Sequence, residues 1–204
     1  GIDTNYFSFD ERKLEIDLLE SKKINVVLIS RLIKSKGIID FCELAKQIRK
    51  KYDNVIFNIV GNIPKNSPDK ISINIFKKYN KHVKFLGLKK DVKKTLSESH
   101  LMVFPSRYAE GVPRVLLEAA SMGLPLIAYE NAGSNEVIHH NKNGYLIEKG
   151  NIKSLVKHTL LILKDKNIYK NFSIYSRKIS KNEFDISIVA KHYKNLYNSL
   201  LIDK

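Results

Sequence analysis

Two glutamates, Glu110 and Glu118, lie on either side of a predicted helix start. The stretch 103–123 begins with a short apolar run that a proline ends, continues as a polar loop over residues 106–112, and changes to good helix formers after Pro113. Proline favours the first turn of a helix, and glycine favours its end. We therefore expect Glu110 in a loop at the carboxyl end of a strand and Glu118 about a turn and a half into the helix, so that both carboxylates could face one cleft.

The start of this helix also offers unpaired backbone donors. The first N–H groups of a helix have no partner inside it, and the helix dipole places partial positive charge there, which favours phosphate. The residues whose N–H groups we expect to face such an anion are Gly111, Val112, Arg114 and Val115. A phosphate cradle with a carboxylate on each side suits a ligand that carries phosphate and hydroxyl groups, such as a nucleotide sugar.

Each glutamate also has a purely structural interpretation. Glu110 can be a first-turn acid that favours the helix dipole, and most helical glutamates are solvated surface residues, as Glu118 would be if taken alone. Against this, the neighbours of Glu118 are apolar, and an acid on an apolar face needs a partner; these neighbours are Val115, Leu116, Leu117, Ala119 and Ala120. The residues alone leave both interpretations open.

Length and composition bound the class of protein. A chain of 204 residues with 43% hydrophobic content can form a packed core. No apolar run approaches membrane-spanning length and nothing resembles a signal peptide. The first residue is Gly1 rather than Met, so we expect part of a longer protein. The lone Cys42 can form no internal disulfide, which favours a cytoplasmic location.

The charge balance is strongly basic, with a net charge of +15 and 30 lysines among 36 basic residues. The lysines are scattered, and no helix-turn-helix, zinc pattern or aromatic stacking motif accompanies them, so we expect no nucleic-acid partner. Attraction to phosphate-bearing substrates, or a peripheral contact with an anionic membrane, explains the charge better. The six histidines show no metal-binding spacing, and we expect no metal or other cofactor.

Apolar strands without polar alternation, interleaved with helices, predict an α/β fold with a Rossmann-like parallel sheet and helices on both faces. Residues 1–24 are expected to form a loop and a short helix. No linker or repeat interrupts the chain, so we expect a single domain over residues 1–204 that includes C-terminal helices from about residue 151. The predicted strands are 25–30, 55–60, 83–86, 101–104, 126–129 and 145–147, and the predicted helices are 38–51, 69–80, 92–97, 114–122, 135–139, 151–165, 168–180 and 185–201.

Parallel sheets bind ligands outside the carboxyl ends of their strands. At those ends the sequence places Arg31 with Lys36, then Gly61, then residues 87–89, and then Glu110. Arg31 and Lys36 could equally be solvated loop charges, and Gly61 could simply end a strand. Their shared position at one edge favours a ligand site.

Eight motifs in order along the chain resemble the C-terminal, donor-binding domain of glycosyltransferase family 4, whose members are retaining enzymes of the two-domain GT-B fold. The motifs are G-I-D-T-x-x-F at 1–7, S-R-L-x-x-x-K-G at 30–37, F-x-I-V-G at 57–61, V-x-F-L-G at 83–87, P-S-x-x-x-E-G-x-P-x-V-L-L-E-A at 105–119, G-x-P-x-I-A at 123–128, G-x-x-E-V-I at 133–138 and N-G-Y-L-I at 143–147.

The resemblance implies roles for individual residues. Arg31 and Lys36 match the basic pair that neutralises the donor diphosphate, for which two charges on one turn are physically suited. Glu110 matches the first glutamate of the family's paired motif, which lies beside the transferred sugar and is the implied catalytic residue. Glu118 matches the second, which binds the two ribose hydroxyls.

Other positions match the family less directly. Leu88 and Lys89 fall where family members bracket the base, and Gly61 falls in the donor-binding edge. Residues 62–64 lack the second glycine that many members have after F-x-I-V-G, and Pro113 supplies one phosphate-facing N–H fewer than a glycine would.

The resemblance implies transfer of a sugar from a nucleoside-diphosphate donor, UDP-linked by expectation, to a glycan or lipid-linked oligosaccharide in bacterial surface polysaccharide or glycoconjugate synthesis. The acceptor is expected to bind an N-terminal domain that this sequence lacks, so the chain alone should transfer almost nothing. Two other classes stay open: a non-catalytic nucleotide or polyanion binding module, and a basic adaptor for a membrane surface or nucleic acid.

Overall fold

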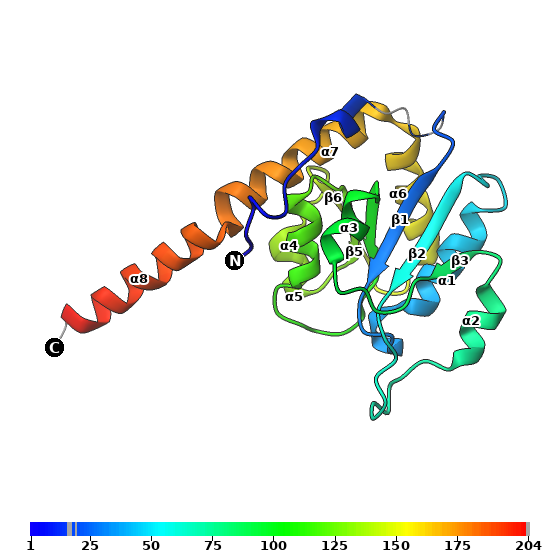
Figure 1. Ribbon diagram of the computed structural model, residues 1–204, viewed down its shortest axis with the longest axis horizontal. Helices are drawn as coiled ribbons and strands as arrows, with labels where there is room; N and C mark the ends of the chain where they lie inside the picture. Colours follow the sequence, from blue (N-terminus) through cyan, green and yellow to red (C-terminus); the bar gives the residue numbers. More distant parts are fainter. Residues whose placement is uncertain (16–17, 19, 203–204) are drawn as a thin grey trace.

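The protein is built around a six-stranded parallel sheet with the strand order β3-β2-β1-β4-β5-β6 (Figure 1). The computed structural model describes residues 1–15, 18 and 20–202. The predicted strands are confirmed: β1 is shifted by one residue, and β3 and β6 each differ by one residue at one end. The strands are β1 (Ile24–Ile29), β2 (Val55–Val60), β3 (Val83–Phe85), β4 (Leu101–Phe104), β5 (Leu126–Tyr129) and β6 (Gly144–Ile147).

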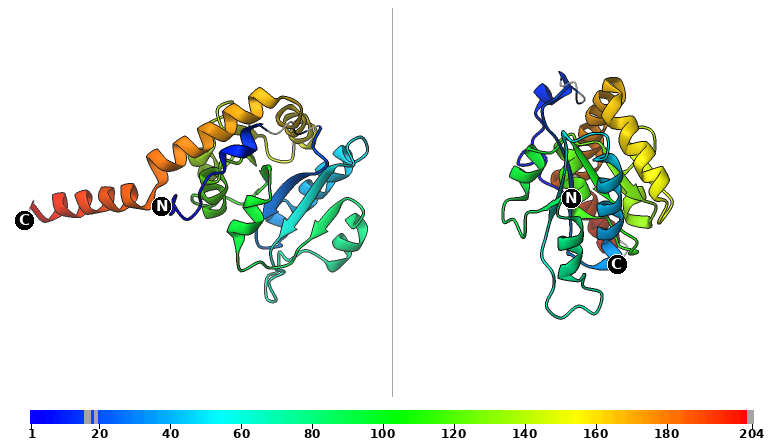
Figure 2. Two further views of the ribbon diagram at one scale, coloured as in Figure 1. Left: turned by 45° about the horizontal axis from the view of Figure 1, so that its top comes forward. Right: turned by 90° about the vertical axis from the view of Figure 1, so that its right-hand side faces the viewer.

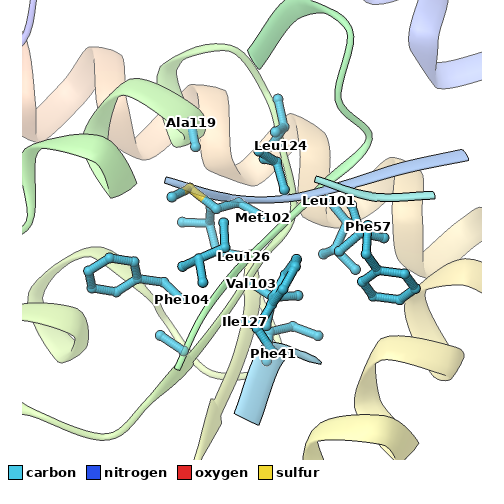
Figure 3. Packing of buried hydrophobic residues seen from close by; sticks show 14 of the residues in the cluster. Phe41, Phe57, Leu101, Met102, Val103, Phe104, Ala119, Leu124, Leu126 and Ile127 are labelled. Atoms are coloured by element: carbon cyan, nitrogen blue, oxygen red, sulfur yellow. The ribbon is translucent and has the colours of Figure 1, made fainter. Parts of the chain in front are cut away.

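The core lies on both faces of the central strands. All four residues of β4 and all four of β5 are buried, as expected for parallel strands without polar alternation. Figure 3 shows Ala119 and Leu124 on one side of β4 and Phe41 on the other. Phe41 also meets Phe57 edge-to-face, with ring centroids 5.6 Å apart. The sheet is therefore anchored from two layers of helices.

Helices cover both faces of the sheet, as predicted (Figures 1 and 2). On one side α1 packs on β2 and β3, and α6 packs on β5 and β6. On the other side α4 packs on β4 and β5, with α5 and α7 against it. The helices around the sheet are α1 (Ile38–Ile48), α2 (Ile73–Tyr79), α3 (Val92–Ser97), α4 (Arg114–Ser121), α5 (Ala132–Val137) and α6 (Ile152–Lys164).

The three largest differences between predicted and observed helix bounds lie at helix caps. The helix expected over 38–51 stops at Ile48, where Arg49 is the C-cap. The helix expected over 69–80 begins only after Ser72, whose side chain accepts a hydrogen bond from the Asn74 N–H. The helix expected over 135–139 is α5, which starts three residues earlier because Asn131 caps it.

The C-terminal region is helical, as predicted, with α7 (Lys166–Ile179), a π-helical segment η3 (Ser180–Phe184) and α8 (Ile186–Ile202). Helix α8 projects away from the rest of the molecule (Figures 1 and 2). Its exposed apolar residues include Tyr193, Leu196, Tyr197 and Leu200.

The first residues of the chain lie against this C-terminal region. The Ile2 N–H donates to the Phe184 carbonyl, and the Ile186 N–H donates to the Ile2 carbonyl. The short helix predicted within residues 1–24 is the 3-10 helix η1 (Glu11–Glu15), while residues 16, 17 and 19 lie outside the described residues. Within the described ranges, no helix is both long and apolar enough to cross a membrane.

Candidate active site

A cleft of about 300 Å³ opens at the carboxyl ends of β1 and β4, where the sequence predicted a ligand site. We call it the strand-edge cleft. It brings together five of the predicted residues, Arg31, Lys36, Glu110, Arg114 and Val115. The remaining lining residues are Ile29, Ser30, Phe104 and Pro113.

Lys36 and Glu110 form an ion pair at the centre of this cleft. The Lys36 Nζ lies 2.6 Å from each carboxylate oxygen of Glu110, and the side chains are 7% and 21% exposed. The Ser106 hydroxyl donates to Glu110 Oε1 at 2.9 Å, which fixes the carboxylate from a second direction. The ammonium also lies 5.5 Å from the ring centroid of Phe104 and 5.5 Å from that of Tyr108. A nearly buried cation is thus held next to the acid that the sequence singled out.

The loop that carries Lys36 fits closely against the end of β4. Gly37 has φ +70°, and a Cβ on it would come within 1.9 Å of the Pro105 carbonyl oxygen. The backbones also bond directly, since the Arg107 N–H donates to the Ser35 carbonyl at 2.7 Å. A glycine at position 37 therefore lets the two halves of the cleft approach each other.

Asp69 holds the same loop from the opposite side. The Lys34 N–H donates to the Asp69 carbonyl at 2.8 Å, and the Ser35 N–H donates to Asp69 Oδ2 at 3.0 Å. Hydrogen bonds from the Ser35 side chain and backbone lower the pKa of Asp69. The segment expected to start a helix at residue 69 instead clamps the Lys36 loop.

A buried carboxylate ties the Glu110 loop to α1 and β5. Asp40 Oδ2 accepts from Arg107 Nε at 3.0 Å, from Arg107 Nη2 at 2.8 Å and from the Tyr129 hydroxyl at 2.9 Å. The hydrogen bond to Asp40 raises the pKa of Arg107, and burial followed by the Asp40 charge raises the pKa of Tyr129. We call Asp40, Arg107 and Tyr129 the Asp40 clamp.

The amino-terminal end of α4 differs in detail from the prediction. Pro113, in an extended conformation, is the N-cap, so α4 begins at Arg114, and Gly111 and Val112 lie in the preceding bend. These two residues therefore lie in the predicted loop and not in the first turn of the helix, because α4 begins only after the extended Pro113. Among the described residues, the N–H groups of Arg114 and Val115 have no hydrogen-bond acceptor, and both residues line the strand-edge cleft.

Glu118 has the partner that its apolar surroundings required. Its side chain is 12% exposed, and Arg114 Nε lies 3.1 Å from Glu118 Oε1. Burial raises the pKa of Glu118, and the hydrogen bond from Arg114 opposes this effect. Glu118 does not line the strand-edge cleft but lies one turn further along α4, connected to the cleft through Arg114.

Five other predicted residues also lie outside the cleft lining: Gly111 and Val112 in the bend before α4, and Gly61, Leu88 and Lys89. Gly61 is buried, and a Cβ on it would come within 1.8 Å of the Ser30 carbonyl oxygen, so its backbone packs against the end of β1. Leu88 is 69% exposed, and Lys89 lines a different pocket, on the face of the sheet. Of these residues, Gly61 packs against Ser30 of the cleft lining, whereas the structure does not bring Leu88 or Lys89 into the strand-edge cleft.

The sequence patterns did not single out Ser106 or the Asp40 clamp. Ser106 and Arg107 stood within the motif over 105–119, and Asp40 stood on the apolar face of the predicted first helix. An acid on that face was a usable signal, since a buried carboxylate requires donors. Within the described part of the chain, no group of three or more His, Cys, Asp or Glu residues could hold a metal ion.

Comparison with known proteins identifies the family and the fold. Residues 10–179 match the family of glycosyl transferases group 1, and the chain belongs to that family. Its α/β fold is that of GT-B glycosyltransferase structures. A structure of Anabaena HepE in complex with UDP superimposes on it with a TM-score of 0.84 at 20% sequence identity. The superposition covers 98% of this chain and 56% of the HepE chain.

Two bacterial relatives illustrate the family. The capsular polysaccharide biosynthesis glycosyltransferase CapM of Staphylococcus aureus is 25% identical over 203 residues, which are 98% of this chain and 53% of CapM. The UDP-Gal:α-D-GlcNAc-diphosphoundecaprenol α-1,3-galactosyltransferase of Escherichia coli is 28% identical over 210 aligned residues, with 100% of this chain and 54% of the relative covered. The chain thus spans about half the length of these relatives.

Proposed function

We propose that the chain is the donor-binding half of a family 4 glycosyltransferase that transfers a sugar from a UDP-linked donor with retention at the anomeric carbon. The observation that carries the proposal is the Lys36–Glu110 pair beside Arg31 and the free N–H groups of α4, all in one cleft. The motif resemblance supports family 4 and retention. UDP as the donor nucleotide is supported by the UDP complex of HepE and by the UDP-Gal donor in the name of the E. coli relative.

In this proposal the diphosphate binds where the positive groups converge. Arg31 is exposed, and its guanidinium has no hydrogen-bond or ion-pair partner among the described residues. The guanidinium is therefore available to a phosphate. The N–H groups of Arg114 and Val115 add neutral donors at the positive end of the helix dipole. Together they stabilise the charge that develops on the departing diphosphate.

Lys36 and Glu110 act as a unit. Because the ammonium is neutralised by Glu110 in the ligand-free protein, Lys36 can turn toward phosphate only while Glu110 gains other donors, such as sugar hydroxyls. Glu110 then lies beside the anomeric carbon, where a carboxylate stabilises positive charge. The bond from that carbon to the diphosphate oxygen breaks, a bond to the acceptor hydroxyl forms, and the hydroxyl proton passes to the diphosphate.

Glu118 is proposed to bind the ribose hydroxyls. Its Oε1 accepts from Arg114, which leaves Oε2 for one ribose hydroxyl. When the Arg114 guanidinium turns to the phosphate, Oε1 becomes available to the second hydroxyl. Gly111, Val112, Gly61, Leu88 and Lys89 are proposed to contribute backbone around the same donor, with Leu88 and Lys89 near the base.

The rest of the reaction requires parts that this chain does not contain. The acceptor, a glycan or lipid-linked oligosaccharide of bacterial surface polysaccharide or glycoconjugate synthesis, is proposed to bind the other half of the enzyme. The basic charge suits a cytoplasmic protein in peripheral contact with an anionic membrane. The proposed chemistry needs no metal, because the protein's own cations neutralise the diphosphate.

Calorimetric titration with UDP, GDP and ADP tests donor binding. We expect UDP to bind more tightly than GDP or ADP. Glu118→Ala should lower the affinity for UDP at least about tenfold, which is the effect of losing a hydrogen bond to a charged group. Glu148→Ala, which removes an exposed carboxylate elsewhere, is the matched control and should bind UDP unchanged. Equal binding of all three nucleotides, unaffected by Glu118→Ala, would favour a charge-driven polyanion module instead.

Transfer itself is tested on the full-length protein. We expect Glu110→Gln to retain UDP binding while the rate of sugar transfer falls at least about 100-fold. The anomeric configuration of the product, measured by NMR, decides retention; inversion would overturn the retaining mechanism.

A further inference from the structure

A second pocket, of about 420 Å³, lies on the face of the sheet formed by β1, β2 and β3. Five lysines line it: Lys23, Lys84, Lys89, Lys90 and Lys94. We call it the lysine pocket. It shares no lining residue with the strand-edge cleft, although the backbone of Lys89 is proposed above to lie near the donor base, and its volume is that of a small-molecule site.

The floor of this pocket is unusual for a parallel sheet. Such sheets are normally apolar and covered on both faces, yet Ile56 and Asn58 on β2 are only partly buried and Lys84 on β3 is exposed. Figure 1 looks onto this face, where β1 and β2 are seen with no helix in front of them. Of the helices in the described residues, only the six-residue α3 borders it, through Lys94 and Thr95.

Hydrogen bonds hold the polar floor in place. Asn25, which is 9% exposed, donates from Nδ2 to the Glu98 carbonyl at 2.7 Å, and Asn58 Nδ2 donates to Asn25 Oδ1 at 3.3 Å. The Asn58 side-chain oxygen accepts no hydrogen bond from the described residues. An amide oxygen at the bottom of a pocket is therefore available to a ligand hydroxyl.

The charges around the pocket are not balanced within the protein. None of the five lysines forms an ion pair with a described carboxylate, and all five are exposed. Asp91 and Glu98 also line the pocket, so five cations face two anions and a net charge of three positive remains. A concave site with excess positive charge concentrates anions.

We propose that the lysine pocket is a second anion site that binds a phosphate-bearing ligand independently of the strand-edge cleft. A phosphate provides the charge and the acceptor oxygens that several ammonium groups can share. The pocket has space beside one phosphate for a hydroxyl-bearing group attached to that phosphate. The free Asn58 side-chain oxygen at the floor can accept a hydrogen bond from that hydroxyl. The ligand class is thus a phosphate monoester or diester, either soluble or presented as a lipid headgroup.

Inorganic pyrophosphate is the first probe, followed by NMR of the ¹⁵N-labelled chain. We expect its amide shifts to move around Asn58, Lys84 and Thr95 with a saturation curve separate from that of the strand-edge cleft. Lys84→Glu/Lys94→Glu should weaken this binding about tenfold or more, since two attractive contacts become repulsive. Lys153→Glu/Lys157→Glu, an equal charge change on exposed lysines of α6, should leave the pocket titration unchanged.

Vesicles distinguish the two sources of phosphate. Co-sedimentation with phosphatidylglycerol vesicles but not with phosphatidylcholine vesicles, lost in Lys84→Glu/Lys94→Glu and kept in the α6 control, would assign a lipid headgroup. Pyrophosphate binding without vesicle binding would assign a soluble ligand. The proposal would be overturned if both double variants changed pyrophosphate and vesicle binding equally, or if no amide shifts moved in the pocket. Either outcome would leave the proposed UDP binding in the strand-edge cleft standing, because that binding is measured separately.

Discussion

Lysines at two places in this protein are used in opposite ways. In the strand-edge cleft, Lys36 is nearly buried, and both oxygens of Glu110 hold it at 2.6 Å. In the lysine pocket, five lysines are exposed without a described carboxylate partner. A buried pair contributes to the folded state and limits where a ligand can bind, whereas an exposed cluster repels itself until an anion arrives. The two regions should therefore respond differently to loss of a lysine.

The largest effect is expected at the buried pair. Lys36→Met leaves Glu110 and its hydrogen bond from Ser106 beside an apolar chain, and should lower the free energy of unfolding by about 2–3 kcal/mol. Urea denaturation measures this change. Lys153→Met on the exposed face of α6 is the control, with an expected change below about 0.5 kcal/mol.

A double-mutant cycle sharpens the result. Because Glu110→Gln no longer needs the cation, Lys36→Met/Glu110→Gln should be less destabilised than the sum of the single changes, by about 1–2 kcal/mol. Simple additivity would show that the pair contributes nothing to folding and would remove the contrast between the two regions.

The next effect is expected in the Asp40 clamp. Tyr129→Phe removes one of three hydrogen bonds to a buried carboxylate and should cost about 1–2 kcal/mol, again measured by urea denaturation. Tyr193→Phe on α8 removes an exposed hydroxyl and should change nothing. If the clamp also positions the cleft, UDP affinity measured by calorimetry should fall a few-fold; a stability loss with unchanged affinity would limit the clamp to folding.

Glu118 gives a smaller, pH-dependent effect. Burial raises its pKa above the reference value of 4.5, so the folded state binds the proton more tightly than the unfolded state does. Its contribution to stability is complete below pH 4.5 and declines as the pH rises through the raised folded value. The difference in unfolding free energy between the wild type and Glu118→Gln should therefore fall over this window in denaturation at stepped pH. Glu148→Gln should show no such trend.

The smallest effect is expected in the lysine pocket. Lys84→Met removes one of five mutually repelling charges, so stability at low salt should stay the same or rise by less than about 0.5 kcal/mol. Any gain should vanish near 1 M salt, where screening acts within a few ångströms. Thermal denaturation at two salt concentrations measures it, and a clear loss of stability would show that Lys84 has a structural partner.

Short apolar runs interleaved with helical patterns were enough to predict the sheet, because the residues of β4 and β5 are buried on both of its faces. Helix starts were less predictable, since capping by Ser72 and Asn131 outweighed the pattern that followed. The position of Lys36 at the edge was predictable, but its pairing with Glu110 was not. Partners 74 residues apart in sequence meet only through the approach of Gly37 to Pro105.

Hydrogen bonds between residues 1–7 and residues 177–186 bear on the order in which the protein folds. Arg177 Nη1 donates to the carbonyls of Thr4, Phe7 and Ser121, and the Thr4 hydroxyl donates to Asp185. The hydrogen bonds that attach Thr4 and Phe7 to the rest of the protein therefore join partners 114 to 181 residues apart in sequence. Contacts so distant in sequence form slowly, so this segment should dock after the sheet has formed.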